Sequence, residues 1–217
     1  MTPAWLIWGS DAALVAAVAL VLAIGPQGLL QQVTGERATW RRALGVAGPA
    51  AVAGFACLAW FAWLHLPLLA GPLAAAAVTL VAVMVVDGRW LVIPDVFIAA
   101  LALLGLAGAA RIGWTSALIG LALGGGLLAA VRWAFLRWRK IEGLGFGDVK
   151  LMAAVGLLVG EDVLWVIVAA SALGAGWLLF SRSATETRLL APFGACAAVP
   201  AFAMLAARTL LGSGPAL

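Results

Sequence analysis

The sequence predicts an all-α fold, a polytopic bundle of about seven to eight transmembrane helices. Two observations lead to this fold class. Hydrophobic residues make up 65% of the 217-residue chain, charged residues make up only 10%, and the mean hydropathy is +1.14, whereas a soluble domain needs a larger charged surface. The apolar residues also come in blocks of about 20, which as helices cross a hydrocarbon layer of roughly 30 Å. Sheets are disfavoured because the blocks lack the alternation of barrel strands.

The predicted spans follow these blocks in order. They cover residues 11–30, 43–64, 68–86, 91–110, 114–131, 149–159, 163–181 and 189–210. The sixth block is short, so we expect either a partial helix or one that starts earlier, which leaves the number of spans open. No polar stretch is long enough for a soluble domain. We therefore expect one membrane-embedded domain over residues 1–217, with N-terminal helices in 1–79.

Basic residues lie almost entirely on one side of the predicted bilayer. With the N-terminus outside, every Lys and Arg except Arg111 and Arg208 falls in a loop or at a helix end on the inner side. Such asymmetry predicts that this side is cytoplasmic. It also explains the pI of about 10.0 by contact with anionic lipid. The lipid bilayer, and not a nucleic acid, is therefore the expected partner of the basic loops.

Neither a metal centre nor a cofactor site is predicted. Cys57 and Cys196 lie in separate predicted spans without a C-x-x-C pair, and His65 is the single histidine. Metal-binding and disulfide frameworks need closely spaced ligands of these types. Small apolar packing is the expected role of both cysteines.

The informative residues are carboxylates at predicted helix ends, where a charge is costly unless it is solvated, paired or used. Asp87 follows an apolar run that ends at Val86, and Asp148 precedes one that starts at Val149. Both are therefore predicted at the cytoplasmic boundary of the membrane. Asp95 follows Pro94 at a predicted helix start, where a proline and an acidic residue both suit the first turn.

Asp87 and Asp148 can act as a pair if their helices are neighbours. Two like charges near a low-dielectric region do not both ionise readily, so one carboxyl retains a proton. In aspartyl hydrolysis the ionised member takes a proton from water and the protonated member binds the scissile carbonyl, without a metal or cofactor. A structural explanation competes with this one, in which Asp148 is a helix N-cap and Asp87 only marks a loop.

The local sequence around each aspartate carries a motif. Asp87 opens Asp-Gly-Arg-Trp-Leu-Val-Ile-Pro-Asp, and Asp148 closes Gly145-Phe146-Gly147-Asp148, which continues into Val149 and Lys150. Together these segments resemble the type IV prepilin peptidase family, whose hallmarks are an aspartate at a helix end before Ile-Pro-Asp or Ile-Pro-Asn, and a later G-x-G-D motif. The segment Pro192-Phe193-Gly194 is similar to a third family motif near the C-terminal end. The resemblance covers about residues 80–205.

This resemblance implies an intramembrane aspartyl endopeptidase of the bacterial cytoplasmic membrane, with Asp87 and Asp148 as the catalytic pair. It would remove the short basic leader of prepilins or pseudopilins, which would be its protein partners, at the cytoplasmic face. Gly145 and Gly147 would let the backbone approach the substrate. Three neighbours are expected to support the site. Asp95 would attract the basic leader, and Lys150 would orient Asp148 or a lipid phosphate. Pro94 occupies the position of the proline in the family's Ile-Pro-Asp motif.

One departure from the family pattern is informative, and two other functions stay open. Many members carry a cytoplasmic insertion with two C-x-x-C pairs that is linked to methylation, whereas residues 31–42 contain no cysteine. A peptidase-only form is therefore predicted. An ion- or proton-coupled transporter would place carboxylates near the bilayer midplane in paired halves. A catalytically silent assembly protein of the same fold remains the other alternative, and the oligomeric state is not predicted.

Overall fold

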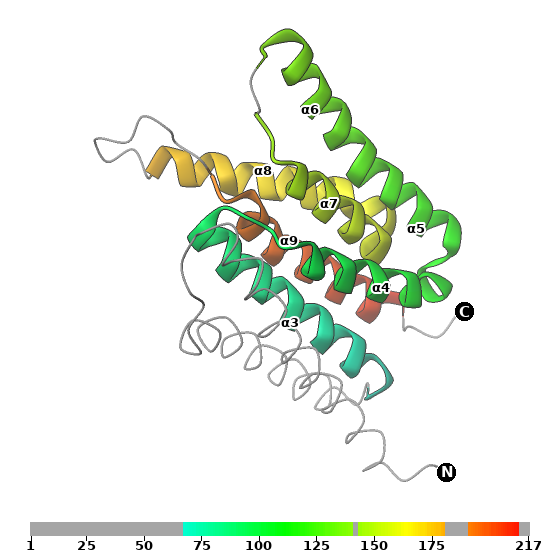
Figure 1. Ribbon diagram of the computed structural model, residues 1–217. Coiled ribbons are helices and arrows are strands. Elements are labelled where there is room, and N and C mark those ends of the chain that lie inside the picture. Colours follow the sequence, from blue (N-terminus) through cyan, green and yellow to red (C-terminus); the bar gives the residue numbers. More distant parts are fainter. Residues whose placement is uncertain (1–66, 141–142, 181–190, 213–217) are drawn as a thin grey trace, which may run out of the picture.

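The computed structural model describes residues 67–140, 143–180 and 191–212, which are helical and contain no strand (Figure 1). The all-α prediction is confirmed for this part of the chain. The two spans predicted over residues 11–30 and 43–64 lie outside the described residues, so the expected number of spans stays a prediction.

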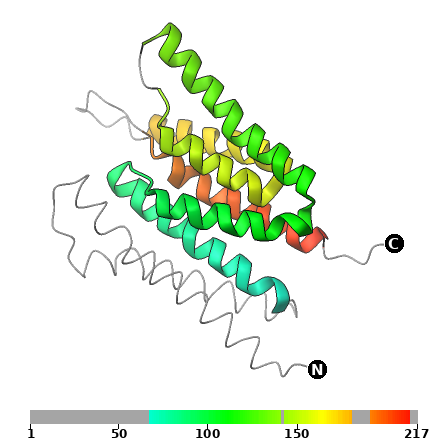
Figure 2. The same cartoon turned by 45° about the vertical axis from the view of Figure 1, so that its right-hand side comes forward.

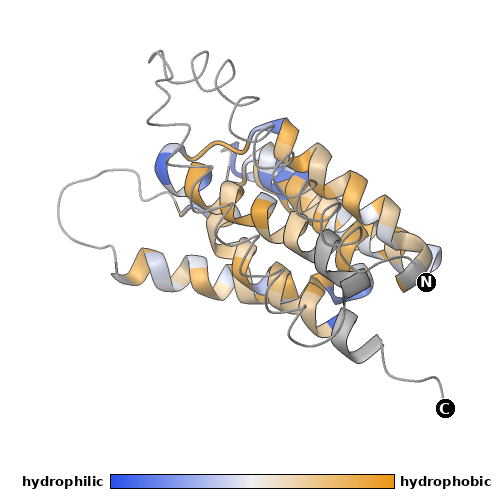
Figure 3. Cartoon of the chain, turned by 90° about the horizontal axis from the view of Figure 1, so that it is seen from below, coloured by the Kyte–Doolittle hydropathy of each residue, from blue (hydrophilic) through white to orange (hydrophobic). Residues whose placement is uncertain are grey.

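The described chain forms the following helices in order: α3 (Pro67–Trp90), α4 (Asp95–Ile112), α5 (Trp114–Leu121), the π-helical η1 (Ala122–Gly126), α6 (Leu127–Trp138), α7 (Phe146–Val159), the short 3-10 turn η2 (Gly160–Asp162), α8 (Val163–Phe180) and α9 (Phe193–Gly212). Their bodies are mostly apolar, and hydrophilic residues lie mainly near helix ends (Figure 3). Two runs, Trp114–Trp138 with 25 residues and Phe146–Leu179 with 34, are long and apolar enough to cross a membrane.

Neither run is one uniform α-helix. The second turns back at Gly160, which has a φ of +63° that suits glycine, so α7 and α8 run in opposite directions (Figure 1). The first continues through η1 and α6 to Trp138. Our prediction that this span ends at residue 131 is therefore wrong. Apolar side chains interleaved with the arginines after residue 131 let the helix continue.

The ends of the helices define two ends of the bundle. At the Asp87 end, α3, α6 and α8 finish and α4, α7 and α9 begin, whereas α5 begins and α9 finishes at the opposite Arg208 end. Figures 1 and 2 both show the outer part of α6 extending beyond its neighbours at the Asp87 end. The successive runs α3, α4, α5 to α6, α7, α8 and α9 thus alternate in direction.

Small residues let α7, most of whose residues are buried, pack closely against its neighbours. A Cβ added at Gly156 of α7 would lie 2.1 Å from the carbonyl oxygen of Gly120 in α5, and one at Gly120 would lie 2.2 Å from that of Gly156. In η1, a Cβ at Gly124 would lie 2.2 Å from the Met152 carbonyl oxygen. Close backbone approach of this kind is how helices pack in lipid, where no hydrophobic effect drives them together.

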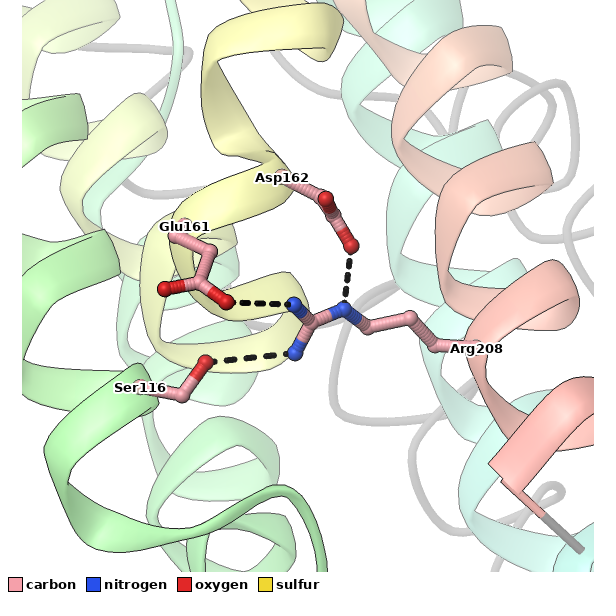
Figure 4. Close-up of polar contacts among 4 residues, drawn as sticks. All are labelled: Ser116, Glu161, Asp162 and Arg208. Atoms are coloured by element: carbon pink, nitrogen blue, oxygen red, sulfur yellow. Dashed lines mark hydrogen bonds and ion pairs between the residues drawn. The ribbon is translucent and has the colours of Figure 1, made fainter.

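A charged cluster holds the Arg208 end together (Figure 4). The Arg208 guanidinium of α9 donates to the Asp162 carboxylate of η2, lies 3.6 Å from that of Glu161, and donates to the Ser116 hydroxyl of α5 at 3.3 Å. These contacts connect three separate helical segments, α5, η2 and α9.

Candidate active site

Asp87 lies in the last turn of α3, and only 4% of it is exposed. The helix runs past Val86 to Trp90, where the Leu91 amide donates to the Asp87 carbonyl at 2.9 Å. Leu91 has a φ of 54°, a left-handed value that ends the helix and redirects the chain. The structural explanation that Asp87 only marks a loop is therefore wrong, because this carboxylate is buried within a helix.

The start of α9 supplies the partners of the Asp87 carboxylate. The Ala195 amide donates to Asp87 Oδ2 at 2.9 Å, and the Gly194 amide also donates to this carboxylate. The first amides of a helix have no intrahelical acceptor, so they suit an anionic group. A Cβ at Gly194 would lie 3.1 Å from Asp87 Oδ2 and 2.7 Å from Ile93 Cδ1. The Pro-Phe-Gly motif, for which the sequence analysis predicts no role, thus brings backbone donors against Asp87.

Asp148 is the third residue of α7, and its side chain is half-buried. The helix starts three residues earlier than predicted, at Phe146, with Gly145 as the N-cap. The N-cap explanation of Asp148 is therefore wrong, because this carboxylate reaches back and accepts a hydrogen bond from the Gly145 amide. This is the reciprocal half of a capping box.

The two motif glycines differ in what surrounds them. A Cβ at Gly145 would lie 3.0 Å from Asp148 Oδ2, so the missing side chain gives room to the carboxylate itself. A Cβ at Gly147 would lie 3.5 Å from the Ile93 Cβ, an ordinary packing distance. The approach of a substrate backbone, which we expected at both glycines, stays a prediction.

Asp87 and Asp148 line one open cavity of about 590 Å³ at the Asp87 end of the bundle. They are close enough for their charges to interact. The rest of the wall is mostly apolar and comes from the α3–α4 connection, the segment before α7, the end of α8 and the start of α9. Its other members are Leu91, Val92, Ile93, Gly143, Leu144, Gly145, Phe146, Gly147, Leu178, Ala191 and Phe193. The arrangement combines two acids, a route for water and space for an extended apolar chain.

A comparison with protein families agrees with these features. The model described as the type IV leader peptidase family matches residues 73–179. Across this stretch the chain belongs to the type IV leader peptidase family. The match includes both cavity aspartates. No curated protein and no solved structure matched the chain.

Membership in the leader peptidase family makes the chain a peptidase, and hence a hydrolase. Its apolar helices are consistent with a membrane protein. Within the described residues, no group of three or more His, Cys, Asp or Glu side chains could hold a metal ion.

The three expected site-supporting residues, Lys150, Pro94 and Asp95, lie beside the cavity and do not line it. Lys150 Nζ lies 2.9 Å from Asp95 Oδ1, so Lys150 connects α7 to the start of α4. Its expected role toward Asp148 or lipid phosphate stays a prediction. Pro94 is the buried N-cap residue of α4. The Asp95 side chain is 72% exposed. Its expected attraction of a basic leader stays a prediction, and Lys150 offsets part of its charge.

Proposed function

We propose that this chain is an aspartic endopeptidase that removes the short basic leader of type IV prepilins or pseudopilins. Asp87 and Asp148 are the catalytic pair in this proposal. The observation that carries it is the shared cavity, in which one deeply buried and one half-buried carboxylate face a mostly apolar wall. Membership in the leader peptidase family supports the reaction class.

The proposed reaction needs one proton shared between the two carboxylates. The ionised carboxylate takes a proton from water while the water oxygen attacks the scissile carbonyl carbon, and the protonated carboxyl donates a hydrogen bond to the carbonyl oxygen. When the tetrahedral intermediate collapses, the C–N bond breaks and the leaving nitrogen takes a proton from the pair. Because the two groups titrate together, the starting base is assigned to the pair and not to one residue.

The position of the cavity fits a substrate that is half in lipid and half in water. Asp87 and Asp148 lie at the end of the bundle where α6 brings Arg137, and Arg139 and Lys140 follow it. Under the positive-inside rule this is the cytoplasmic face of the bacterial inner membrane. The basic leader would then remain in the cytosol, its apolar continuation would lie in the bilayer, and the scissile bond would reach the two carboxylates.

Residues 31–42 contain no cysteine pairs, so the proposed activity does not include methylation. The chain would cleave the leader only, and any methylation of the new N-terminus would need another protein. Mass spectrometry of the product separates these outcomes, because cleavage alone leaves a free, unmodified amine.

The test is cleavage of a candidate prepilin by the purified protein in lipid. Asp87→Asn and Asp148→Asn each remove half of the acid–base pair, so neither variant should shorten the substrate. Glu161→Gln is the matched control, since its carboxylate is exposed at the opposite end of the bundle, and it should cleave at the wild-type rate. Full activity in either aspartate variant would show that the catalytic assignment is wrong.

A further inference from the structure

Phe146 occupies the variable position of the G-x-G-D motif, and the reaction described above gives it no role. It is the first residue of α7, it is 57% exposed, and it lines the cavity that contains both aspartates. An exposed aromatic ring at the start of a helix carries no free-energy penalty where it contacts lipid. Its place in the wall of this cavity, however, brings it beside the proposed scissile bond.

Two cations flank the Phe146 ring. Lys150 Nζ lies 5.1 Å from the ring centroid and the Arg132 guanidinium carbon lies 5.9 Å from it. Both distances are within the range of attraction between a cation and an aromatic face. The ring is therefore approached by one cation from α6 and by one from its own helix, α7.

Both cations are themselves anchored. Lys150 is bound to Asp95 at the start of α4 at 2.9 Å, and Arg132 donates to the Leu144 carbonyl in the segment before the motif. Each side chain therefore has a second partner that fixes its position. Cations from α6 and α7 thus contact the ring, and Asp95 at the start of α4 binds one of them.

The segment before the motif also packs directly on α6. A Cβ at Gly143 would lie 3.2 Å from the Phe135 ring, so the absence of a side chain lets this segment lie against the helix. Arg132 lies one helical turn before Phe135, and its bond to Leu144 continues the same contact. The part of α6 that extends beyond its neighbours in Figures 1 and 2 therefore supports the segment that leads into α7.

We propose that Phe146 is a specificity-determining residue, whose ring forms the wall that receives an apolar side chain next to the scissile bond. Arg132 and Lys150 are positioning residues that hold the ring. This inference rests on the proposed leader peptidase function. Other wall residues near the ring, including Leu91, Leu178 and Phe193, offer the same apolar chemistry. The two cations disfavour a basic side chain at this position, so the basic residues of the leader must lie elsewhere.

The experiment compares two substrates that differ only in the residue beside the scissile bond, a large apolar residue or alanine. Wild-type protein should prefer the large residue by about tenfold or more in kcat/KM, the discrimination that an apolar pocket provides. Phe146→Ala should reduce this preference to within about threefold, chiefly by raising KM for the large substrate. Phe146→Leu keeps an apolar wall and should retain most of the preference.

The positioning residues need a separate comparison. Arg132→Ala should raise KM for the large substrate by about fivefold, while Arg132→Lys, which keeps the cation, should stay within about twofold of wild type. Arg137→Ala is the matched control because it removes an exposed arginine from the same helix, and it should leave KM unchanged. Adding Arg132→Ala to Phe146→Ala should raise KM no further, since the ring that the arginine holds is already gone.

The outcomes separate this inference from the function on which it rests. If Phe146→Ala keeps the wild-type preference and the wild-type unfolding temperature, the wall assignment is wrong, while the aspartate variants still test catalysis independently. If Phe146→Ala does not fold, Phe146→Leu and Arg132→Ala supply the measurement, and wild-type preference in both would overturn the inference. If the wild-type protein cleaves no prepilin, both the function and this inference are wrong.

Discussion

Gly194→Ala tests whether the start of α9 must lie directly against the Asp87 carboxylate. The added Cβ would lie 3.1 Å from Asp87 Oδ2 and 2.7 Å from Ile93 Cδ1. The Ile93 tip can rotate, but the carboxylate is held by the Ala195 amide at 2.9 Å, so accommodation must displace one of these groups. Overpacking of this kind costs about 1–3 kcal/mol of stability.

The expected effect on catalysis is larger than the effect on stability. A displacement of about 1 Å in a reacting group can reduce the rate by about 100-fold, so we expect kcat for prepilin cleavage to fall by about 10- to 100-fold. Cleavage rates and thermal unfolding are measured on the same preparation in lipid. Only a fall in kcat that exceeds any loss of folded protein supports the reasoning.

Gly108→Ala is the matched control for this substitution. Gly108 lies within α4, and a Cβ there would have no atom within 4 Å. Alanine in a helix is favoured over glycine by about 0.5–1 kcal/mol, so this variant should be slightly more stable and fully active. Wild-type kcat in Gly194→Ala, with unchanged unfolding, would refute the need for close contact between α9 and Asp87.

Three further outcomes are expected. Gly156→Ala should lower the free energy of unfolding by about 3 kcal/mol or more, because its Cβ would meet the Gly120 carbonyl oxygen at 2.1 Å. A denaturation midpoint equal to that of the wild type would contradict the close packing of α5 on α7. Arg208→Ala should lower the unfolding free energy by about 1 kcal/mol, since its ion pairs are partly exposed, and should leave kcat near wild type; a loss of activity without a loss of stability would be unexpected. The rate of leader cleavage should rise with pH as one carboxylate of the pair ionises and fall at higher pH as the shared proton is lost, so a flat profile between about pH 4 and pH 9 would contradict a shared proton.

The sequence predicts the positions of helices better than their ends. Composition and block length place α4 and α8 within a few residues of the structure, because lipid requires long apolar segments. The ends of α3 and α6 are missed because polar and aromatic residues at the membrane boundary are compatible with both helix and loop. Asp87 therefore lies inside a helix whose predicted end was residue 86, and Asp148 lies inside a helix whose predicted start was residue 149.

The same limit applies to the site. The motifs identify Asp87 and Asp148, and the structure brings both to one cavity. The partner of Asp87 is an amide 108 positions away, at Ala195, and no local pattern specifies a contact of that kind. A possible signal was the Pro-Phe-Gly segment, since proline before a helix and glycine in its first turn allow backbone to approach a ligand.

Lys150 shows that sequence spacing does not reveal a tertiary partner. It lies two residues after Asp148, residues i and i+2 of a helix do not face each other, and its side chain binds Asp95 of another helix. Its expected orientation of Asp148 or of lipid phosphate stays a prediction. The sequence does not predict the contact between Arg132 and Phe146. Their relation depends on how α6 lies against the segment before α7, which is a tertiary contact.

In the proposed reaction, the carboxylates of Asp87 and Asp148 act as one unit on one peptide bond. The decisive measurement is the cleavage rate of a prepilin by the wild type, Asp87→Asn, Asp148→Asn and the double variant in the same lipid. We expect each single variant to lose about 1,000-fold or more and the double variant to lose little beyond that, because residues that act as a unit are non-additive. A single variant that cleaves at the wild-type rate, or losses that multiply in the double variant, would contradict the account.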